Sequence, residues 1–330
     1  MDLTYSTTQT YSNAFFAGLD DYINIHQVNQ PWLNQQLAGN RLPHVFVYGH
    51  EPAFKAFHTD CLGSEPTARN TFWESLTAAG SKVYLCGHDH FFNVARIDDG
   101  DGNPTNDLYQ FIVGTGGSTN WAEQRYNYNG TNAPYTPVNL WNITNTWGYL
   151  LVEISGPGTN DLGVTMTWKQ RTYDTNTATY LYVATTNVFS YTAVNRYQDS
   201  VGDGIPDWWR AQYFGGTGTT TNSISCASAD PDHDGMNNYQ EYLAGTNPTN
   251  TASVFKIQSL TNSAAGFTIN FQSAWGRNYT LYSATNLAAG TWAAVPSQAT
   301  ILGDGGVDAL TDSTTATNTQ RFYRIGVSLP

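Results

Sequence analysis

Charged residues are scarce in this sequence, and positively charged ones are scarcer still. Only 12% of the 330 residues are charged, and 14 lysines and arginines against 26 aspartates and glutamates give a formal net charge of −12. A surface with this balance would repel a phosphate backbone. Nucleic acid is therefore not an expected partner.

Long apolar runs and cysteines are scarce too. No stretch approaches 18 consecutive apolar residues, so we expect no membrane span. The start, MDLTYSTTQT, lacks a basic region followed by an apolar core and does not resemble a signal peptide. The odd number of cysteines excludes a full disulfide framework. The three are Cys61, Cys86 and Cys226, and we expect Cys86, inside an apolar run, to be a small buried residue.

Uncharged polar residues take the place of the missing charges. Thr, Asn, Gly and Tyr are abundant, while apolar residues make up 40%. A polar surface built from Thr and Asn instead of Lys and Glu is typical of all-β or mixed extracellular proteins. The length allows two or three domains. We therefore expect an α+β multi-domain fold.

Residues 1–198 form the first expected domain, in which strands and helices alternate before the pattern becomes all-β. Apolar periodicity, with Pro31 at a first helical position and Gly39 and Gly80 as C-terminal caps, predicts the early elements. Strands are expected at 14–19, 44–48 and 83–86, and helices at 30–39 and 69–80. Later alternating runs, such as GYLLVEIS and VTMTWKQR, predict strands of a second sheet.

Two successive strands of this β-α-β unit each end in Gly-His. His50 follows the first strand, and His88 and His90 follow the second in the stretch VYLCGHDHFF. Strands joined by a crossover helix run parallel, so their carboxyl ends meet at one edge of the sheet, where ligand sites lie. An isolated HxH is commonly a polar turn, but three imidazoles at one edge favour a metal site.

The other histidines of this domain lack the position at a strand end. We interpret His26 and His44 as structural or surface residues. His58 lies in the loop after His50 and could line a pocket, but a solvated loop residue is the plainer interpretation.

The stretches YGHEPAF (48–54), YLCGHDHFF (84–92) and DLYQFIVGTGGS (107–118) resemble the calcineurin-like metallophosphoesterases. The similarity is greatest to their purple-acid-phosphatase-like and cyclic-nucleotide-phosphodiesterase-like branches and covers about residues 10–195. It implies a partial α/β sandwich and hydrolysis of small phosphoesters with two transition metals (Fe, Zn or Mn). It also implies that His50 and His88 bind one metal and His90 the other, while Asp89 orients the loop.

The DxH, GDxxD and GNH motifs of that family do not occur in this sequence. The stretch TYSNAFFAGLD (10–20) resembles the strand that follows GNH in the family. We therefore expect the chain to be the carboxyl-terminal part of such an enzyme, with its true start before Met1. Without a bridging carboxylate, three neutral imidazoles make a poor two-metal centre, so we expect the isolated chain to be inactive. No residue is assigned a catalytic role.

Residues 199–250 form an expected calcium-binding module. The stretch DPDHDGMNNYQE (230–241) matches the twelve-residue EF-hand loop, in which alternating acids surround one hard cation and a final Glu chelates it with both oxygens. The expected calcium ligands are Asp230, Asp232, Asp234, the main-chain carbonyl of Met236, Asn238 and Glu241. An acidic turn without an ion is the alternative.

An earlier loop, DSVGDGIPDWWR (199–210), has the same frame in degraded form. Val201 stands where an acid is expected, and Arg210 stands in place of the final Glu. Weaker calcium candidates here are Asp199, Asp203 and Asp207. The pair of loops resembles the dockerin and thrombospondin type 3 repeats that act as calcium-stiffened spacers in secreted bacterial proteins.

Residues 251–330 form an expected antiparallel β-sandwich. Short alternating runs, GFTINFQS, NYTLYSAT and RFYRIGVS, are separated by Gly, Asn and Asp turns. Trp275, Tyr282 and Trp292 could contact an extracellular carbohydrate or surface, but core packing is the commoner role of such aromatic residues, and no binding site is claimed.

Together these patterns predict a secreted, metal-dependent phosphoester hydrolase with a calcium module and a sandwich appendage. The alternative is a non-catalytic extracellular binding or structural protein that reuses a remnant of the same fold. The sequence does not identify the substrate or the metal pair.

Overall fold

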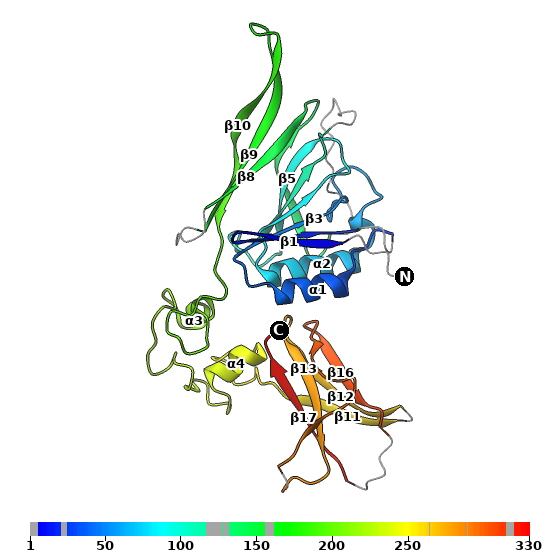
Figure 1. Cartoon of the computed structure of the whole chain (residues 1–330), viewed down its shortest axis with the longest axis vertical. Coiled ribbons are helices and arrows are strands. Elements are labelled where there is room, and N and C mark those ends of the chain that lie inside the picture. The colour runs from blue at the N-terminus through cyan, green and yellow to red at the C-terminus, as the bar shows by residue number, and fades with distance from the viewer. Residues whose placement is uncertain are drawn as a thin grey trace. The chain divides into compact units, whose positions relative to one another are not determined.

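The chain divides into two compact units, residues 1–195 and 196–330. The computed structural model describes residues 6–20, 25–116, 128, 132–155, 162–263, 265–288, 290–314 and 320–330. These residues form several sheets and four α-helices (Figure 1). The expected α+β multi-domain class is confirmed. None of the helices in the described ranges has the length and hydropathy needed to span a bilayer.

A seven-stranded sheet is the centre of the first unit, with the order β1-β2-β3-β4-β6-β5-β7. Strands β2, β3, β4 and β6 run parallel to one another, and the other pairs are antiparallel. The strands are β1 (Thr7–Tyr11), β2 (Ala14–Gly18), β3 (His44–Tyr48), β4 (Val83–Cys86), β5 (Phe92–Asp98), β6 (Leu108–Val113) and β7 (Thr136–Ile143). The predicted parallel β-α-β unit is therefore present, with β3 beside β4.

Two helices lie side by side in this unit, α1 (Gln30–Gly39) and α2 (Pro66–Ala79), and a short 3-10 turn, η1 (Leu62–Ser64), precedes α2 (Figure 1). Gly39 is the last residue of α1 and not its cap, since Asn40 takes the C-cap position. Helix α2 begins three residues earlier than the predicted 69, because Pro66 suits a first helical turn. It ends as expected at Gly80, whose φ of 75° is left-handed.

A second, antiparallel sheet covers the first, with the order β10-β9-β8. Its strands are β8 (Gly148–Ile154), β9 (Gly163–Asp174) and β10 (Thr179–Thr192), which confirms the predicted strands at the GYLLVEIS and VTMTWKQR runs. Val164, Met166 and Trp168 face the large sheet, where the Trp168 ring stacks on Phe92 at 4.2 Å between centroids. Full burial of each such side chain stabilises the fold by about 1.5–3 kcal/mol.

The second unit combines two short helices with a small sandwich. The helices are α3 (Asp207–Phe214) and α4 (Asn238–Ala244). The sandwich strands are β11 (Ile257–Ser263), β12 (Gly266–Gln272), β13 (Asn278–Ala284), β14 (Ala293–Ala294), β15 (Ile301–Leu302), β16 (Val307–Asp312) and β17 (Phe322–Ser328). They form two antiparallel sheets, β11-β12-β16 and β14-β13-β15 with β17 beside β13. Ile269, Phe271 and Leu281 belong to their shared core.

Candidate functional site

The carboxyl ends of β3 and β4 hold His50 and His88 next to each other. Backbone bonding continues past both strands, because the Gly49 N–H donates to the Leu85 carbonyl at 3.1 Å and the Gly87 N–H to the His50 carbonyl at 2.9 Å. His88 has a φ of 64°, a left-handed backbone that non-glycine residues adopt rarely. Such strained backbone conformations are common at functional sites.

The two imidazoles meet through their nitrogen atoms. His88 Nδ1 lies 3.2 Å from His50 Nε2, and the two rings are nearly perpendicular at 85°. Two nitrogens on one tetrahedral zinc ion, each bonded at about 2.0–2.1 Å, would lie about 3.3 Å apart. The observed separation therefore suits shared metal coordination, and it also suits one neutral imidazole donating to the other.

The surroundings of His50 favour the neutral form of its ring. Partial burial of the ring, followed by the neighbouring His88 and His90, lowers the pKa of His50 below its ordinary value, while Glu51 opposes the shift. A neutral imidazole has a lone pair to offer a metal. His88 Nε2 is buried and lies 3.5 Å from Asp60 Oδ1, close enough to interact with that carboxylate.

Asp89 ties the loop after β4 to the loop that carries His58. Its carboxylate is fully buried and accepts the N–H groups of Phe57 and His58, both at 3.1 Å. The same carboxylate lies 2.5 Å from His58 Nδ1. This geometry suits the orienting role predicted for Asp89. His58 is not a solvated residue apart from the cluster, since its ring centroid lies 5.0 Å from that of His88.

A glycine permits this loop to approach the next strand. A Cβ atom on Gly114, just after β6, would lie 1.9 Å from the Asp89 carbonyl oxygen, so only glycine fits there. The Gly114 N–H donates to the Phe91 carbonyl at 3.1 Å. Part of the DLYQFIVGTGGS stretch thus supports the histidine loop, while residues 117 and 118 lie outside the described ranges.

The third predicted ligand is not part of the same close group. Within the described ranges, no third His, Cys, Asp or Glu brings a ligand atom within 4.8 Å of both His50 and His88. His90 is near enough to lower the pKa of His50. The structure thus brings His50 and His88 together as a pair, and metal binding by the three histidines stays a prediction.

The remaining two histidines of this unit have separate surroundings. His26 Nδ1 lies 3.0 Å from both carboxylate oxygens of the fully buried Glu51. His44 is 1% exposed, and neither ring nitrogen has a hydrogen-bond partner in the described ranges.

The loop at 230–241 holds five buried side-chain oxygens that have no hydrogen-bond partner in the described ranges. Three carboxylates, from Asp230, Asp232 and Asp234, place oxygens within 4.8 Å of one another. The buried oxygens that accept no hydrogen bond in the described ranges are Asp230 Oδ1, Asp232 Oδ2, Asp234 Oδ2, Asn238 Oδ1 and Glu241 Oε2. They come from the side chains predicted to bind calcium.

The opposite oxygens of the same carboxylates hold the loop in shape. Asp230 accepts the Gly235 N–H at 3.1 Å, and Asp234 accepts the Met236 N–H at 2.7 Å. Gly235 has a φ of 98°, which only glycine adopts without strain. The Asn238 amide nitrogen donates to the carbonyls of Ile224 and Cys226, which turns its oxygen toward the acids.

Glu241 shows the electrostatic cost of this arrangement. Burial, followed by Asp232 and with smaller effects of Asp234 and Asp230, raises the pKa of Glu241 to about 7. A hydrogen bond from Thr246 at 3.2 Å acts in the opposite direction. A bound divalent cation would offset the repulsion among these carboxylates.

The degraded loop at 199–210 has its own internal cation. The Arg210 guanidinium is 1% exposed and donates to Asp203 Oδ1 at 2.6 Å and to the Gly218 carbonyl at 2.9 Å. Asp199 and Asp207 accept backbone N–H groups from Gly202, Gly204 and Ser200. Because these carboxylates already have partners, the geometry does not favour the weaker calcium candidates. The arginine at the twelfth position is the sequence signal for this difference.

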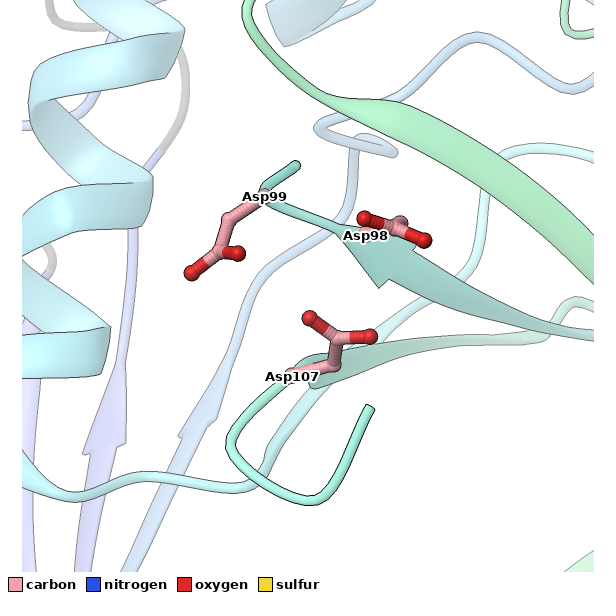
Figure 2. Close-up of side chains that lie close together, drawn as sticks. All are labelled: Asp98, Asp99 and Asp107. Atoms are coloured by element: carbon pink, nitrogen blue, oxygen red, sulfur yellow. The ribbon is translucent and has the colours of Figure 1, made fainter. Parts of the chain in front are cut away.

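A second acidic group, which the sequence analysis did not single out, lies where β5 ends and β6 begins. Figure 2 shows Asp98, Asp99 and Asp107, whose oxygens lie within 4.8 Å of one another. Arg96 pairs with Asp107 and lies 3.4 Å from Asp98. A guanidinium therefore already neutralises part of this cluster.

The sandwich aromatic residues offer no exposed platform. Trp275, Tyr282 and Trp292 are all half-buried. Tyr282 and Trp292 both pack on the Arg324 guanidinium, at 5.1 and 4.7 Å from the ring centroids. Carbohydrate or surface contact stays a prediction.

The comparisons with known proteins found distant structural similarities. No family model matches it, and no curated protein matches it. It is similar to GAP50, "the anchor in the inner membrane complex of Plasmodium", with 15% identity and a TM-score of 0.34 over 58% of this chain and 53% of that one. It is also similar to purple acid phosphatase PPD1 from yellow lupin (Lupinus luteus) seeds, with 12% identity and a TM-score of 0.37 over 57% of this chain and 32% of that one.

A third solved structure, PhoD, has 12% identity and a TM-score of 0.32 over 56% of this chain and 45% of that one. The chain spans about half, or less, of the length of these three proteins. TM-scores this low support no argument about activity.

Proposed function

We propose that the first unit provides part of the metal site of a metal-dependent phosphoester hydrolase. This part, the histidine edge, consists of His50, His88 and His90 after the carboxyl ends of β3 and β4. The 3.2 Å approach of His88 Nδ1 to His50 Nε2, at the carboxyl ends of adjacent parallel strands, is the observation that carries the proposal. Imidazole nitrogens suit zinc and iron. The lowered pKa of His50 fits such a group.

In this proposal His50 and His88 would hold one metal, and His90 would serve a second. A bound metal would supply a Lewis acid for a phosphoryl oxygen. Asp89 keeps the His58 and His88 loops together through its buried carboxylate. A small phosphoester is the proposed substrate, and no catalytic acid or base is assigned.

Metal titration of the whole chain tests this proposal. Zn²⁺ and Mn²⁺ should bind, and His88→Asn should weaken binding by at least about 10–100-fold, the loss that follows from changing even an outer partner. His88 and His233 both have a left-handed backbone, with φ values of 64° and 62°. His233→Asn is therefore a control that replaces a histidine at a position with the same backbone conformation. Equal affinity in wild type and His88→Asn would remove the metal site.

Hydrolysis of an aryl phosphate by this chain should be slow, because in the described ranges no carboxylate oxygen lies within 4.8 Å of both His50 and His88 to bridge two metals. The residual rate should need added metal and should disappear in His50→Ala. Metal binding without any metal-stimulated hydrolysis would favour the alternative, an extracellular binding or structural protein.

We also propose that the second unit binds one calcium ion in the loop from Asp230 to Glu241. The five inward oxygens without partners favour this function. As part of this proposal, the protein is a secreted bacterial protein. The uncharged polar composition and the calcium loop favour this. Calorimetric calcium titration of wild type and Glu241→Gln tests the site.

A further inference from the structure

We propose that the outer face of the three-stranded sheet, near the tip of the β9-β10 hairpin, binds an acidic polysaccharide. Figure 1 shows this hairpin extending past the end of β8. The paired register of β8 and β9 ends at Gly148↔Gln170, so β9 and β10 alone form the tip. The side chains of this surface, which we call the aromatic face, are Trp147, Tyr149, Lys169, Arg171, Tyr173, Tyr180 and Tyr182.

The strand register places these side chains on one side of the sheet. Residues two apart along a strand, and residues opposite each other in an antiparallel pair, point to the same face. Trp168 of β9 is packed in the core, so Lys169 points outward. Arg171 and Tyr173 follow at the same period. The pairs that complete the face are Lys169↔Tyr149, Arg171↔Tyr182 and Tyr173↔Tyr180, and the Arg171 N–H donates to the Trp147 carbonyl at 2.8 Å.

The five rings of the aromatic face are exposed. Their exposed fractions are 45–59%, whereas Trp168 on the opposite side of β9 is fully buried. Tyr149 packs on Tyr182 with 5.2 Å between ring centroids, and Tyr173 packs on Tyr180 with 5.0 Å. Such cross-strand pairs stabilise the hairpin, but much of each ring stays in water. A contiguous group of exposed aromatic side chains is typical of a binding surface.

Two cations belong to the same face, and both are available to a partner. Within the described ranges, Lys169 and Arg171 form no ion pair with a carboxylate. The Arg171 guanidinium lies 3.8 Å from the centroid of the Tyr180 ring and 5.7 Å from that of the Trp147 ring. A guanidinium stacked on a ring keeps its N–H groups for an anion. The rings also restrict the arginine side chain, which reduces the entropy lost on binding.

The carboxylates of the three strands lie away from these cations. Glu153 shares the outer side of β8 but is four residues from Tyr149, about 13 Å along the strand. Asp174 ends β9 on the opposite side, and its carboxylate accepts the Asn176 N–H and the Thr177 hydroxyl, both at 2.8 Å. A locally positive surface on a chain with a net charge of −12 favours an anionic partner.

An acidic polysaccharide matches both the rings and the charges of the aromatic face. A β-linked pyranose with equatorial hydroxyls has a flat C–H face that packs on an aromatic ring while its hydroxyls stay in water. The carboxylate of a uronic acid accepts charge-assisted hydrogen bonds from Arg171 and Lys169. Because the rings outnumber the cations, the face suits a chain in which uronates alternate with neutral sugars.

Two other occupants fit this surface less well. A single-stranded nucleic acid would stack its bases on the rings, but it carries one phosphate per base, and the net charge of −12 repels so dense a charge. A second copy of the chain, packed face to face in a symmetric pair, would bring the same two cations together. A polysaccharide with one uronate in every two sugars avoids both costs.

Calorimetric titration of the full chain with a hyaluronan decasaccharide, in which uronates and neutral sugars alternate, tests the aromatic face. A chelator in the buffer prevents bridging by calcium. Wild type should bind this sugar at one site, more tightly than the uncharged cellohexaose, and more weakly as salt is added. Arg171→Gln should weaken binding by at least about tenfold and reduce its salt dependence, since bonds to a charged donor are lost. Tyr180→Ala should weaken binding of both sugars, whereas Tyr180→Phe should retain it.

Two variants of the same unit are matched controls. Tyr11→Ala and Arg41→Gln change an exposed tyrosine and an exposed arginine outside the aromatic face, and both should bind hyaluronan like wild type. Circular dichroism checks each fold. Lys169→Gln, which should also weaken binding and its salt dependence, replaces Arg171→Gln if that variant does not fold.

The proposal is overturned if wild type does not bind hyaluronan, or if Arg171→Gln and Tyr180→Ala both bind it like wild type. Tighter binding of an oligothymidylate would reject the polysaccharide in favour of single-stranded nucleic acid. A dimer in analytical ultracentrifugation that Tyr180→Ala disrupts would reject it in favour of a second copy. His88→Asn should bind hyaluronan like wild type, because no residue of the aromatic face belongs to the histidine edge. Failure of the hydrolase proposal would therefore leave this one intact.

Discussion

His44 is a buried histidine whose ring nitrogens have no hydrogen-bond partners in the described ranges, although an imidazole normally has such partners. It opens β3, is 1% exposed, and has both ring nitrogens without hydrogen-bond partners in the described ranges. An unsatisfied buried polar group costs about 1–3 kcal/mol. The sequence identified His44 as structural or surface, since a polar residue at the start of an apolar strand can face either way. Its burial follows from the packing of β3 between β2 and β4.

We predict that His44 makes the first unit sensitive to acid. Burial lowers the pKa of His44 below its ordinary 6.5. As pH falls below about 6.5, the His44 imidazole becomes protonated in the unfolded chain but stays neutral in the folded chain. The free energy of unfolding therefore decreases below that pH. Thermal unfolding between pH 7 and 5 should show a smaller loss in His44→Leu than in wild type, with equal or higher stability at pH 7. Parallel pH profiles would contradict this.

At the level of elements, the periodic segments were predictable and the loops were not. Strands β3 and β4 have the predicted bounds because their apolar runs are short and end in glycine. The loop after His50 has no periodic pattern of apolar residues from which its structure could be predicted. A buried amide shapes it, since Gln110 on β6 accepts the Phe54 N–H and donates to the Phe54 carbonyl, both at 2.8 Å. His58 gains its neighbours from this tertiary packing, which spacing alone cannot reveal.

The grouping of Asp230, Asp232 and Asp234 was predictable because these residues are close together in the sequence, so no distant contact is needed to assemble them. Calcium binding by the loop stays a prediction. We predict that calcium raises the melting temperature of wild type, with stabilisation of about 2.7 kcal/mol at a concentration near 100 times the Kd. Glu241→Gln removes one of the four acids and should abolish the rise. Asp203→Asn, which disturbs the Arg210 pair, should lower the baseline yet keep the calcium shift. Scanning calorimetry with and without chelator is the measurement, and an identical wild-type profile in both would refute calcium binding.

At the level of the whole molecule, each proposed ligand belongs to one unit. His50 and His88 lie in residues 1–195, and the proposed calcium loop lies in residues 196–330. The net charge of −12 was readable from composition, and the change of pattern after residue 198 in the sequence lies close to the division between the units at residues 195 and 196.

We therefore predict that the two metal responses are separable in the intact chain. The Zn²⁺-induced shift in melting temperature should disappear in His88→Asn and persist in Glu241→Gln. The calcium-induced shift should show the reverse pattern. Mutual dependence of the two shifts in calorimetry would reveal linkage between the units and contradict this expectation.

The Arg210 guanidinium has a consequence for how the second unit responds to its environment. Unlike an ion, a covalently attached cation cannot dissociate, so the loop at 199–210 keeps its positive centre at every calcium concentration. Paired loops that both fill with calcium can bind cooperatively. Here Arg210 takes the place of an ion in the loop at 199–210. We therefore expect the calcium occupancy of the loop at 230–241 to rise along a simple hyperbola with a Hill coefficient of about one, which gives a graded response rather than a switch.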